Sequence, residues 1–288
     1  MTSPPKPPDF GPPKRLRAEY ERAMRQVTGR VLAPRRPEQS LDDWLAELAD
    51  RSQRKDVQEA AELLARRMVA QVDAGNQRTW REAARKSMQG GRLYRMLQRE
   101  LAGSTGRTFN RLIAENAKYI TSISVDAAAR LVGEVKGAQL QGARPETIAK
   151  MMRVRFPALL RSRVQLIART ETAKASSALT QARAEDLDLP VYEWLTSEDA
   201  RVRASHRNMN GVLVFWADPP SPEALLGEKS TLGAYNVGSC PNCRCTASVV
   251  LSLDDVRWPH RVYRGGVIRS MTRREFLTIA TGDLRRAA

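Results

Sequence analysis

The sequence predicts an α+β protein that is predominantly helical. Between residues 40 and 186, apolar residues recur at spacings of three and four, which is the period of amphipathic helices. After Pro190 the pattern changes to short apolar runs separated by Pro- and Gly-containing loops, which predicts a small antiparallel sheet. These runs are residues 191–195, 212–216 and 246–251. A Cys-rich loop precedes the last run, and we expect a long helix packed on the sheet that carries this loop.

Capping residues divide the helical part. Ser40, followed by Asp42 and Asp43, predicts a helix start, because an N-cap oxygen accepts a backbone N–H and carboxylates favour the positive end of the helix dipole. The sequence Thr79-Trp-Arg-Glu82 matches a capping box after a break at Gly75-Asn76, so a new helix is expected there. Gly90-Gly91 and Gly103 mark candidate breaks in the residues after this helix start.

Three further helices are expected before the sheet. Ser124 predicts an N-cap, and Pro145 suits the first position of a short helix that ends near Met152. A long helix is expected from about Pro157 to Asp186, with alanine and leucine on its apolar face. Near the C-terminus, Thr272-Arg-Arg-Glu275 is a second capping-box match.

Composition divides the chain into four expected segments. The first is rich in proline and arginine and is expected to be a flexible arm with at most a marginal helix. The second is a helical region, the third holds the long helix, sheet and Cys-rich loop, and the fourth is a basic tail. Their bounds are 1–39, 40–105, 106–252 and 253–288.

The net charge of +16 over 288 residues favours polyanionic partners, with nucleic acid first and acidic protein surfaces second. The alternative is that the arginines lie on solvent-exposed helix faces and contact no specific partner. Aromatic residues make up 6% of the chain, which gives no support to a stacking platform for single strands. No apolar run approaches the roughly 20 residues that span a bilayer, so a soluble protein without membrane contact is expected.

The three cysteines lie in one motif, Cys240-x-x-Cys243-x-Cys245. The two-residue spacer lets the backbone fold back and turn three sulfurs toward one point, and His206 is a candidate fourth ligand for a closed tetrahedral zinc site. His260 is the other candidate histidine. Such a site would hold a loop rather than perform chemistry. The alternative is a group of plain thiols; a disulfide is disfavoured by the odd cysteine count and the expected reducing compartment.

Four blocks in this order resemble the phage Mu F-type head morphogenesis family. The blocks are Ile167-Ala-Arg169-Thr-Glu171-Thr-Ala-Lys174, the run Trp194-x-Thr-Ser-x-Asp199-x-Arg201-x-Arg203-x-x-His206, then Gly211, and Asn242-Cys-Arg-Cys245. The resemblance covers about residues 110–252. Cys240 is an addition to the family's Asn-Cys-Arg-Cys core, so the metal prediction rests on this sequence and not on the family.

The resemblance implies a non-enzymatic minor head protein of a tailed phage or prophage. It implies a place in the virion, at the portal vertex or capsid interior, with host cytoplasm as the site of assembly. The expected partners are the portal or major capsid protein, and double-stranded DNA agrees with the positive charge. No small-molecule substrate is expected. Within the motif, Glu171 is predicted to pair with Arg201 or Arg203 and pin the sheet to the helices.

Rival interpretations remain at this stage. A plain nucleic-acid-binding protein shares the charge argument but would need a basic stripe on one face. A zinc-containing nuclease would need more ligands near His206, and a Cys243 or Cys245 nucleophile would need His206 as its base. Tyr263-Arg-Gly265 resembles the opening strand of ADP-ribosyltransferase toxins, but no Glu-x-Glu follows.

Overall fold

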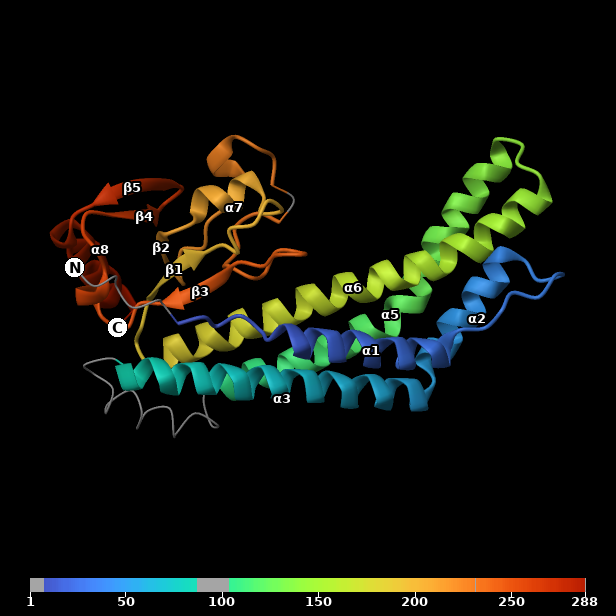
Figure 1. Ribbon diagram of the computed structural model, residues 1–288, viewed down its shortest axis with the longest axis horizontal. Coiled ribbons are helices and arrows are strands. Elements are labelled where there is room, and N and C mark those ends of the chain that lie inside the picture. The colour runs from blue at the N-terminus through green and yellow to red at the C-terminus, as the bar shows by residue number, and fades with distance from the viewer. Residues whose placement is uncertain (1–7, 87–103, 231, 288) are drawn as a thin grey trace. The chain divides into compact units, whose positions relative to one another are not determined.

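The computed structural model describes residues 8–86, 104–230 and 232–287 (Figure 1). The longer helices of this part are α1 (Lys14–Val31), α2 (Leu41–Gln53), α3 (Lys55–Lys86), α5 (Ser104–Leu140), α6 (Pro145–Asp186) and α8 (Arg273–Ala287). The shorter ones are α7 (Ala204–Met209) and the 3-10 turns η2 (Ala224–Leu226) and η3 (Leu253–Asp255). The strands are β1 (Val191–Leu195), β2 (Val212–Phe215), β3 (Thr246–Val249), β4 (His260–Arg264) and β5 (Val267–Met271). The predicted, predominantly helical α+β class is confirmed.

Contacts divide the chain into two compact units. The first, here called the sheet unit, comprises the described residues of Met1–Pro12, Asp73–Thr108 and Ala173–Ala288. The second, the helical unit, comprises Pro13–Val72 and Phe109–Thr172. Helices α3, α5 and α6 therefore each contribute residues to both units. The four linear segments expected from composition stay predictions.

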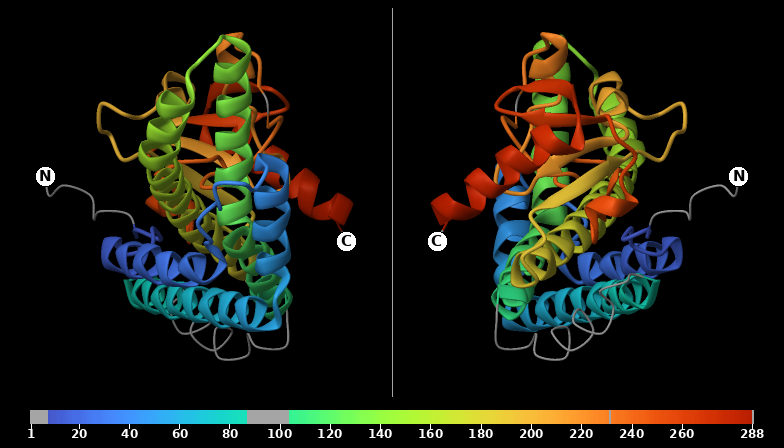
Figure 2. Two further views of the ribbon diagram at one scale, coloured as in Figure 1. Left: turned by 90° about the vertical axis from the view of Figure 1, so that its right-hand side faces the viewer. Right: turned by 90° about the vertical axis from the view of Figure 1, so that its left-hand side faces the viewer.

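The helical unit contains α1, which the sequence led us to expect as part of a flexible arm. This helix buries one side, with Tyr20 and Met24 at its centre, and lies alongside α3 in the views of Figures 1 and 2. The Tyr20 hydroxyl donates to Asn116 Oδ1 on α5 at 3.1 Å, and Ser124 donates to the Thr28 carbonyl. The expectation of an extended arm is wrong from Lys14 onward, because α1 buries one side and is held to α5 by hydrogen bonds.

Several predicted helix boundaries are also wrong. No break occurs at Gly75-Asn76, since α3 continues to Lys86 and Thr79 bonds back to the Gly75 carbonyl. Ser124 lies inside α5, and α6 runs unbroken through Pro157. The cap at Ser40 is confirmed by a hydrogen bond from the Asp43 N–H. Gly90-Gly91 and Gly103 lie outside the described residues.

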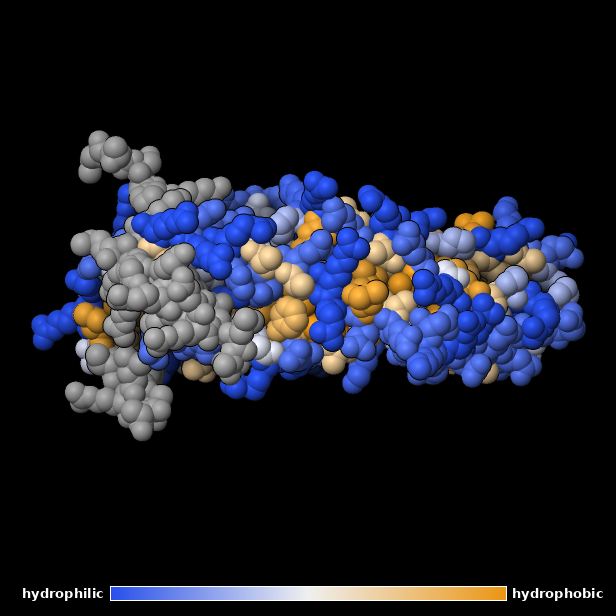
Figure 3. Space-filling model, turned by 90° about the horizontal axis from the view of Figure 1, so that it is seen from below, coloured by the Kyte–Doolittle hydropathy of each residue, from blue (hydrophilic) through white to orange (hydrophobic). Residues whose placement is uncertain are grey.

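The core of the helical unit gathers around Trp44. Its indole donates to the Ala33 carbonyl at 2.9 Å, and its ring packs edge-on against Phe156. Leu48 and Leu131 belong to the same buried cluster. On the face drawn in Figure 3, the described surface is mostly hydrophilic with apolar residues showing between polar ones, as solvated outer helix faces require.

The sheet unit is built on a five-stranded sheet of order β3-β1-β2-β4-β5. The three predicted strands are present and pair antiparallel, but β2 and β4 pair in parallel, so the sheet is mixed rather than purely antiparallel. The C-terminal segment expected as a basic tail supplies β4, β5 and α8. The capping box at its helix start is confirmed, since the Thr272 N–H donates to Glu275 Oε2 at 2.7 Å.

Alternation along the strands gives the sheet two buried faces. One face packs Tyr192, Trp194 and Val214 against Trp80 of α3 and Ala184 of α6. The other face packs residues of β1, β2 and β4 against Phe276 of α8, which lies beside β4 and β5 (Figure 2). The predicted packing of the long helix on the sheet is therefore confirmed within this unit. No helix among the described residues is both long and apolar enough to cross a bilayer.

Candidate metal centre

The pairing of β1 brings the site residues to one edge of the sheet. The end of β1 lies opposite the starts of both neighbours, with Trp194 beside Val212 and Leu195 beside Thr246. The segment that follows β1 carries α7 and His206, and the segment that precedes β3 carries the cysteines. Since both segments leave the sheet at the same edge, the register places His206 next to the cysteine loop.

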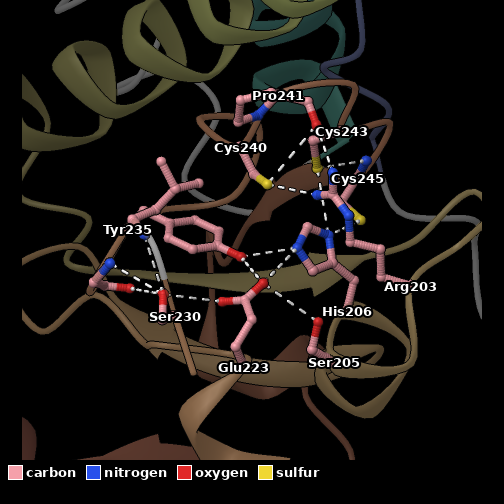
Figure 4. Close-up of polar contacts among 12 residues, drawn as sticks. Arg203, Ser205, His206, Glu223, Ser230, Tyr235, Cys240, Pro241, Cys243 and Cys245 are labelled. Atoms are coloured by element: carbon pink, nitrogen blue, oxygen red, sulfur yellow. Dashed lines mark hydrogen bonds and ion pairs between the residues drawn. The ribbon is translucent and has the colours of Figure 1, made fainter. Parts of the chain in front are cut away.

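Three donors converge at this edge (Figure 4). His206 Nδ1 lies 3.6 Å from Cys243 Sγ and 3.4 Å from Cys245 Sγ. The three donor atoms all lie within 4.8 Å of one another. Zinc bond lengths and tetrahedral angles require about 3.6 Å between a nitrogen and a sulfur ligand. The spacing of the donors therefore fits a tetrahedral metal ion without rearrangement of His206.

Cys240, the remaining predicted ligand, is placed differently. Its Sγ accepts a hydrogen bond from Arg203 Nη1 at 2.5 Å, and Arg203 Nη2 donates to the Pro241 carbonyl at 2.9 Å (Figure 4). The structure thus brings three of the four predicted donors, His206, Cys243 and Cys245, into one cluster. The sulfur of Cys240, the fourth, contacts the Arg203 guanidinium. Arg203 is directed to the cysteine loop, and its predicted pairing with Glu171 stays a prediction.

The opposite side of the His206 ring faces two residues that the sequence interpretation missed. His206 Nε2 lies 2.9 Å from Tyr235 Oη, and that hydroxyl donates to Glu223 Oε1 at 2.7 Å. Figure 4 shows Tyr235 and Glu223 grouped beside the His206 ring, below the cysteines as drawn. Glu223 and Tyr235 stand in loop sequence without metal-ligand spacing, so no local signal connects them to His206.

Electrostatic coupling shifts the pKa of each titratable donor in the cluster. Burial opposes protonation of His206, but hydrogen bonds and charge from Cys240 and Cys243 outweigh it and raise its pKa to about 9. A hydrogen bond from Cys245, together with contact to His206, lowers the pKa of Cys243 to about 4. The hydrogen bond with Cys243 and burial raise the pKa of Cys245. The lowered pKa of Cys243 favours the thiolate form that binds metal, whereas the raised pKa of His206 means that its ring must lose a proton when a metal binds.

Other residues of the resemblance frame the cluster. The Trp194 ring stands edge-on to His206 at 5.5 Å, and the Gly211 N–H donates to the Trp194 carbonyl at 2.8 Å. Asp199 accepts from the Arg201 N–H at 2.9 Å and pairs with Arg244, which lies between Cys243 and Cys245. Hydrogen bonds and an ion pair thus tie the loop after β1 to the cysteine loop.

Three predicted residues lie elsewhere. Arg169 and Glu171 belong to the helical unit, where Glu171 is buried and its charge adds to burial in raising the pKa of Tyr20. The pairing of Glu171 with Arg201 stays a prediction. His260 starts β4, and its Nε2 lies 2.9 Å from the Gly211 carbonyl instead of facing the sulfurs.

Burial limits what the cluster can do. His206 is 2% exposed, and Cys243 and Cys245 are each 4% exposed. A catalytic zinc or an attacking thiolate must present an open position to a substrate, whereas a structural zinc is enclosed by its ligands. The arrangement suits a clasp that joins the α7 segment to the cysteine loop.

Comparison with protein families finds a similarity in the region of the chain that holds this site. Residues 131–248 match the family described as Phage Mu protein F like protein. An uncharacterized protein of Haemophilus influenzae is 30% identical over 142 residues, which make up 49% of this chain and 29% of that protein. The aligned stretch is thus under a third of that protein's length. No solved structure matches this chain.

The family match contains the end of α5, all of α6, β1, α7, β2, the cysteine loop and most of β3. The motif residues from Arg169 to Cys245 all fall inside it. Residues 131–248, which are under half of the chain, are similar to the Phage Mu protein F like family.

Proposed function

We propose that this chain is a non-enzymatic minor head protein of a tailed phage or prophage. The observation that carries the proposal is the family match over residues 131–248, which includes every motif residue of the cysteine-loop site. In this role it acts in head morphogenesis, at the portal vertex or in the capsid interior. Its partners are the portal protein, the major capsid protein or both.

The positive charge supports a contact with packaged DNA. A net charge of +16 creates an attractive field for a dense polyanion. The rival function is that of a plain nucleic-acid-binding protein. Salt separates the two, because DNA binding that rests on phosphate contacts falls steeply as salt rises, whereas attachment to a portal or capsid protein through packed surfaces persists.

The head function is tested in the phage or prophage that encodes the chain. Deletion of the gene is expected to leave heads that fail to assemble or to deliver DNA, and the wild-type gene is expected to restore them. Purified particles are probed with an antibody to the chain. Normal infectious particles that lack the chain would overturn the proposal, and loss of infectivity with the chain bound only to DNA would favour the rival.

We further propose that the cluster binds one structural zinc ion. His206, Cys243 and Cys245 are the core ligands, and the fourth position falls to Cys240 after a side-chain turn away from Arg203. Zinc would draw the α7 segment and the cysteine loop together without supplying an open site for catalysis. This role agrees with a structural rather than enzymatic head protein.

Metal content tests the zinc proposal. Protein purified without chelator is expected to hold about one zinc per chain by elemental mass spectrometry, as a single closed site requires. The double variant Cys243→Ser/Cys245→Ser is expected to lose both the metal and part of the thermal stability, because metal affinity is folding free energy. Wild-type protein without metal, with three titratable free thiols, would remove the clasp and leave the head function standing on the family match.

A further inference from the structure

We propose that Tyr235 and Glu223 are positioning residues of the metal centre, which hold His206 in the tautomer that turns the Nδ1 lone pair toward the sulfurs. The inference rests on the zinc site proposed above. Neither residue belongs to the motif that resembles the family, and both come from the long loop between β2 and β3.

The sense of the hydrogen bonds assigns the tautomer. A phenol has one hydrogen to donate, and Tyr235 gives it to Glu223 Oε1 at 2.7 Å. The Tyr235 hydroxyl oxygen lies 2.9 Å from His206 Nε2. Because its own hydrogen goes to Glu223, it accepts a hydrogen from Nε2, and Nε2 must carry the proton. In the neutral ring Nδ1 then has a free lone pair, at 3.4 Å and 3.6 Å from the two sulfurs.

The tyrosine is needed as a bridge. Glu223 Oε1 lies 3.9 Å from His206 Nε2, which is too far for a direct hydrogen bond. The carboxylate is itself held in place, since Ser205 donates to Oε1 at 3.4 Å and Ser230 donates to Oε2 at 3.5 Å. The backbone of Tyr235 is fixed by its N–H, which donates to the Pro220 carbonyl at 2.8 Å.

Burial strengthens the two hydrogen bonds that connect His206, Tyr235 and Glu223. Tyr235 is 8% exposed, and the side chain of His206 is 3% and that of Glu223 18% exposed. Away from water, a carboxylate behind an imidazole strengthens the hydrogen bonds between them and raises the basicity of the ligating nitrogen. Partners of this kind orient a ligand histidine before the metal arrives.

The competing explanation is that Tyr235 only packs. Its ring centroid lies 6.0 Å from that of His206 and 6.4 Å from that of Trp194, so the aromatic contact is present in any case. Tyr235→Phe keeps the ring and removes the hydroxyl, which separates packing from hydrogen bonding. Glu223→Gln keeps an acceptor for the hydroxyl and removes the charge.

Zinc affinity of the full chain, measured by competition with a chromophoric chelator, tests the inference. Tyr235→Phe is expected to bind zinc about 10- to 100-fold more weakly, which is the usual loss for a removed outer partner of a ligand histidine. Glu223→Gln is expected to lose less, because the hydrogen bond to Tyr235 survives. Tyr263→Phe is the matched control, since Tyr263 is 5% exposed on β4 and lies outside the cluster.

Cobalt substitution distinguishes a weakened site from a collapsed one. Cobalt-loaded Tyr235→Phe is expected to keep the thiolate-to-cobalt absorption of the wild type, with weaker binding. Unchanged zinc affinity in this variant, with a wild type that holds zinc, would overturn the positioning role and leave the zinc site intact. A wild type without metal affinity would overturn both, and the head function is judged separately by the particle assay.

Discussion

Asp199 and Arg244 form a two-pronged ion pair that joins the loop after β1 to the cysteine loop. Arg244 Nη2 donates to Asp199 Oδ1 at 2.6 Å, and Nη1 donates to Oδ2. Bidentate geometry of this kind is stronger and more directional than a single contact between charges. Because Arg244 stands between two of the proposed ligands, this pair restrains the loop independently of any metal.

Acid is expected to weaken this restraint. The hydrogen bond from Arg244, aided by the Arg201 N–H, lowers the pKa of Asp199 from 3.8 to about 2. A lowered folded-state pKa contributes stability that is fully present above the unfolded pKa and is lost as pH falls through the folded pKa. The stability difference between wild type and Asp199→Asn should therefore shrink between about pH 4 and pH 2.

Denaturant unfolding at a series of pH values measures this difference. Glu198→Gln serves as a control, because this neighbouring carboxylate contacts Asn210 rather than an arginine. A constant difference between wild type and Asp199→Asn across that pH range would contradict the assigned pair.

The cysteines are expected to differ in importance. Cys243→Ser removes a core donor and should abolish zinc binding, whereas Cys240→Ser removes a sulfur that the structure turns toward Arg203. We expect Cys240→Ser to retain zinc more weakly, because the three core donors stay and a water molecule or the serine hydroxyl can take the fourth position. Equal loss of zinc in the two single variants would instead show that the fourth ligand is as necessary as the core donors.

The buried ion pair of the sheet unit is expected to matter for stability. Arg183 on α6 is 1% exposed; it donates to Asp73 Oδ1 and to Asn76 Oδ1 on α3, each at 2.6 Å. Asp73→Ala removes a carboxylate that pairs with this buried guanidinium, which costs about 3–5 kcal/mol of unfolding free energy. Glu59→Gln breaks an exposed pair with Lys55 and should change the free energy by less than about 1 kcal/mol.

The packing of the loop before Cys240 rests on a glycine. Gly238 has a φ of +85°, and a Cβ there would lie 2.9 Å from Ser177 Cβ and 3.3 Å from the Ala173 carbonyl oxygen on α6. Gly238→Ala is expected to destabilise the protein by about 1–3 kcal/mol through backbone strain together with this overlap.

Gly227→Ala is the control for Gly238, since Gly227 has a φ of +72° but nothing lies within 4 Å of its Cβ position. The excess loss at Gly238, measured by thermal unfolding, reports the close approach of the loop to α6. Equal losses at the two glycines would assign the whole effect to the backbone angle.

The features that the sequence predicted correctly depend mostly on residues that are close together in the chain. Ser40 and the Thr272–Glu275 box mark real helix starts because a cap involves neighbours within a few residues. The three strand predictions hold because a strand that is buried on both faces appears in the sequence as a short apolar run. The spacing of Cys243 and Cys245 likewise brings two sulfurs together within one short loop.

The helix boundaries that were predicted wrongly rested on the local preferences of a few residues. Thr79 and Ser124 are good caps in isolation, yet each lies inside a long helix where packing outweighs the local preference. Pro157 is carried within α6 for the same reason. The sequence predicted at most a marginal helix within the arm, because the residues of α5 that hydrogen-bond to α1 lie 96 residues away in the chain.

The sequence by itself determined the fold class, the positions of β1, β2 and β3, the family resemblance and the donor types His and Cys. Tertiary structure alone decided the sheet order, the parallel β2–β4 pair and the row from His206 through Tyr235 to Glu223. It also directed Arg203 to Cys240. Contacts between distant segments depend on strand register and loop path, which no residue spacing encodes, whereas caps and alternation depend on neighbours along the chain.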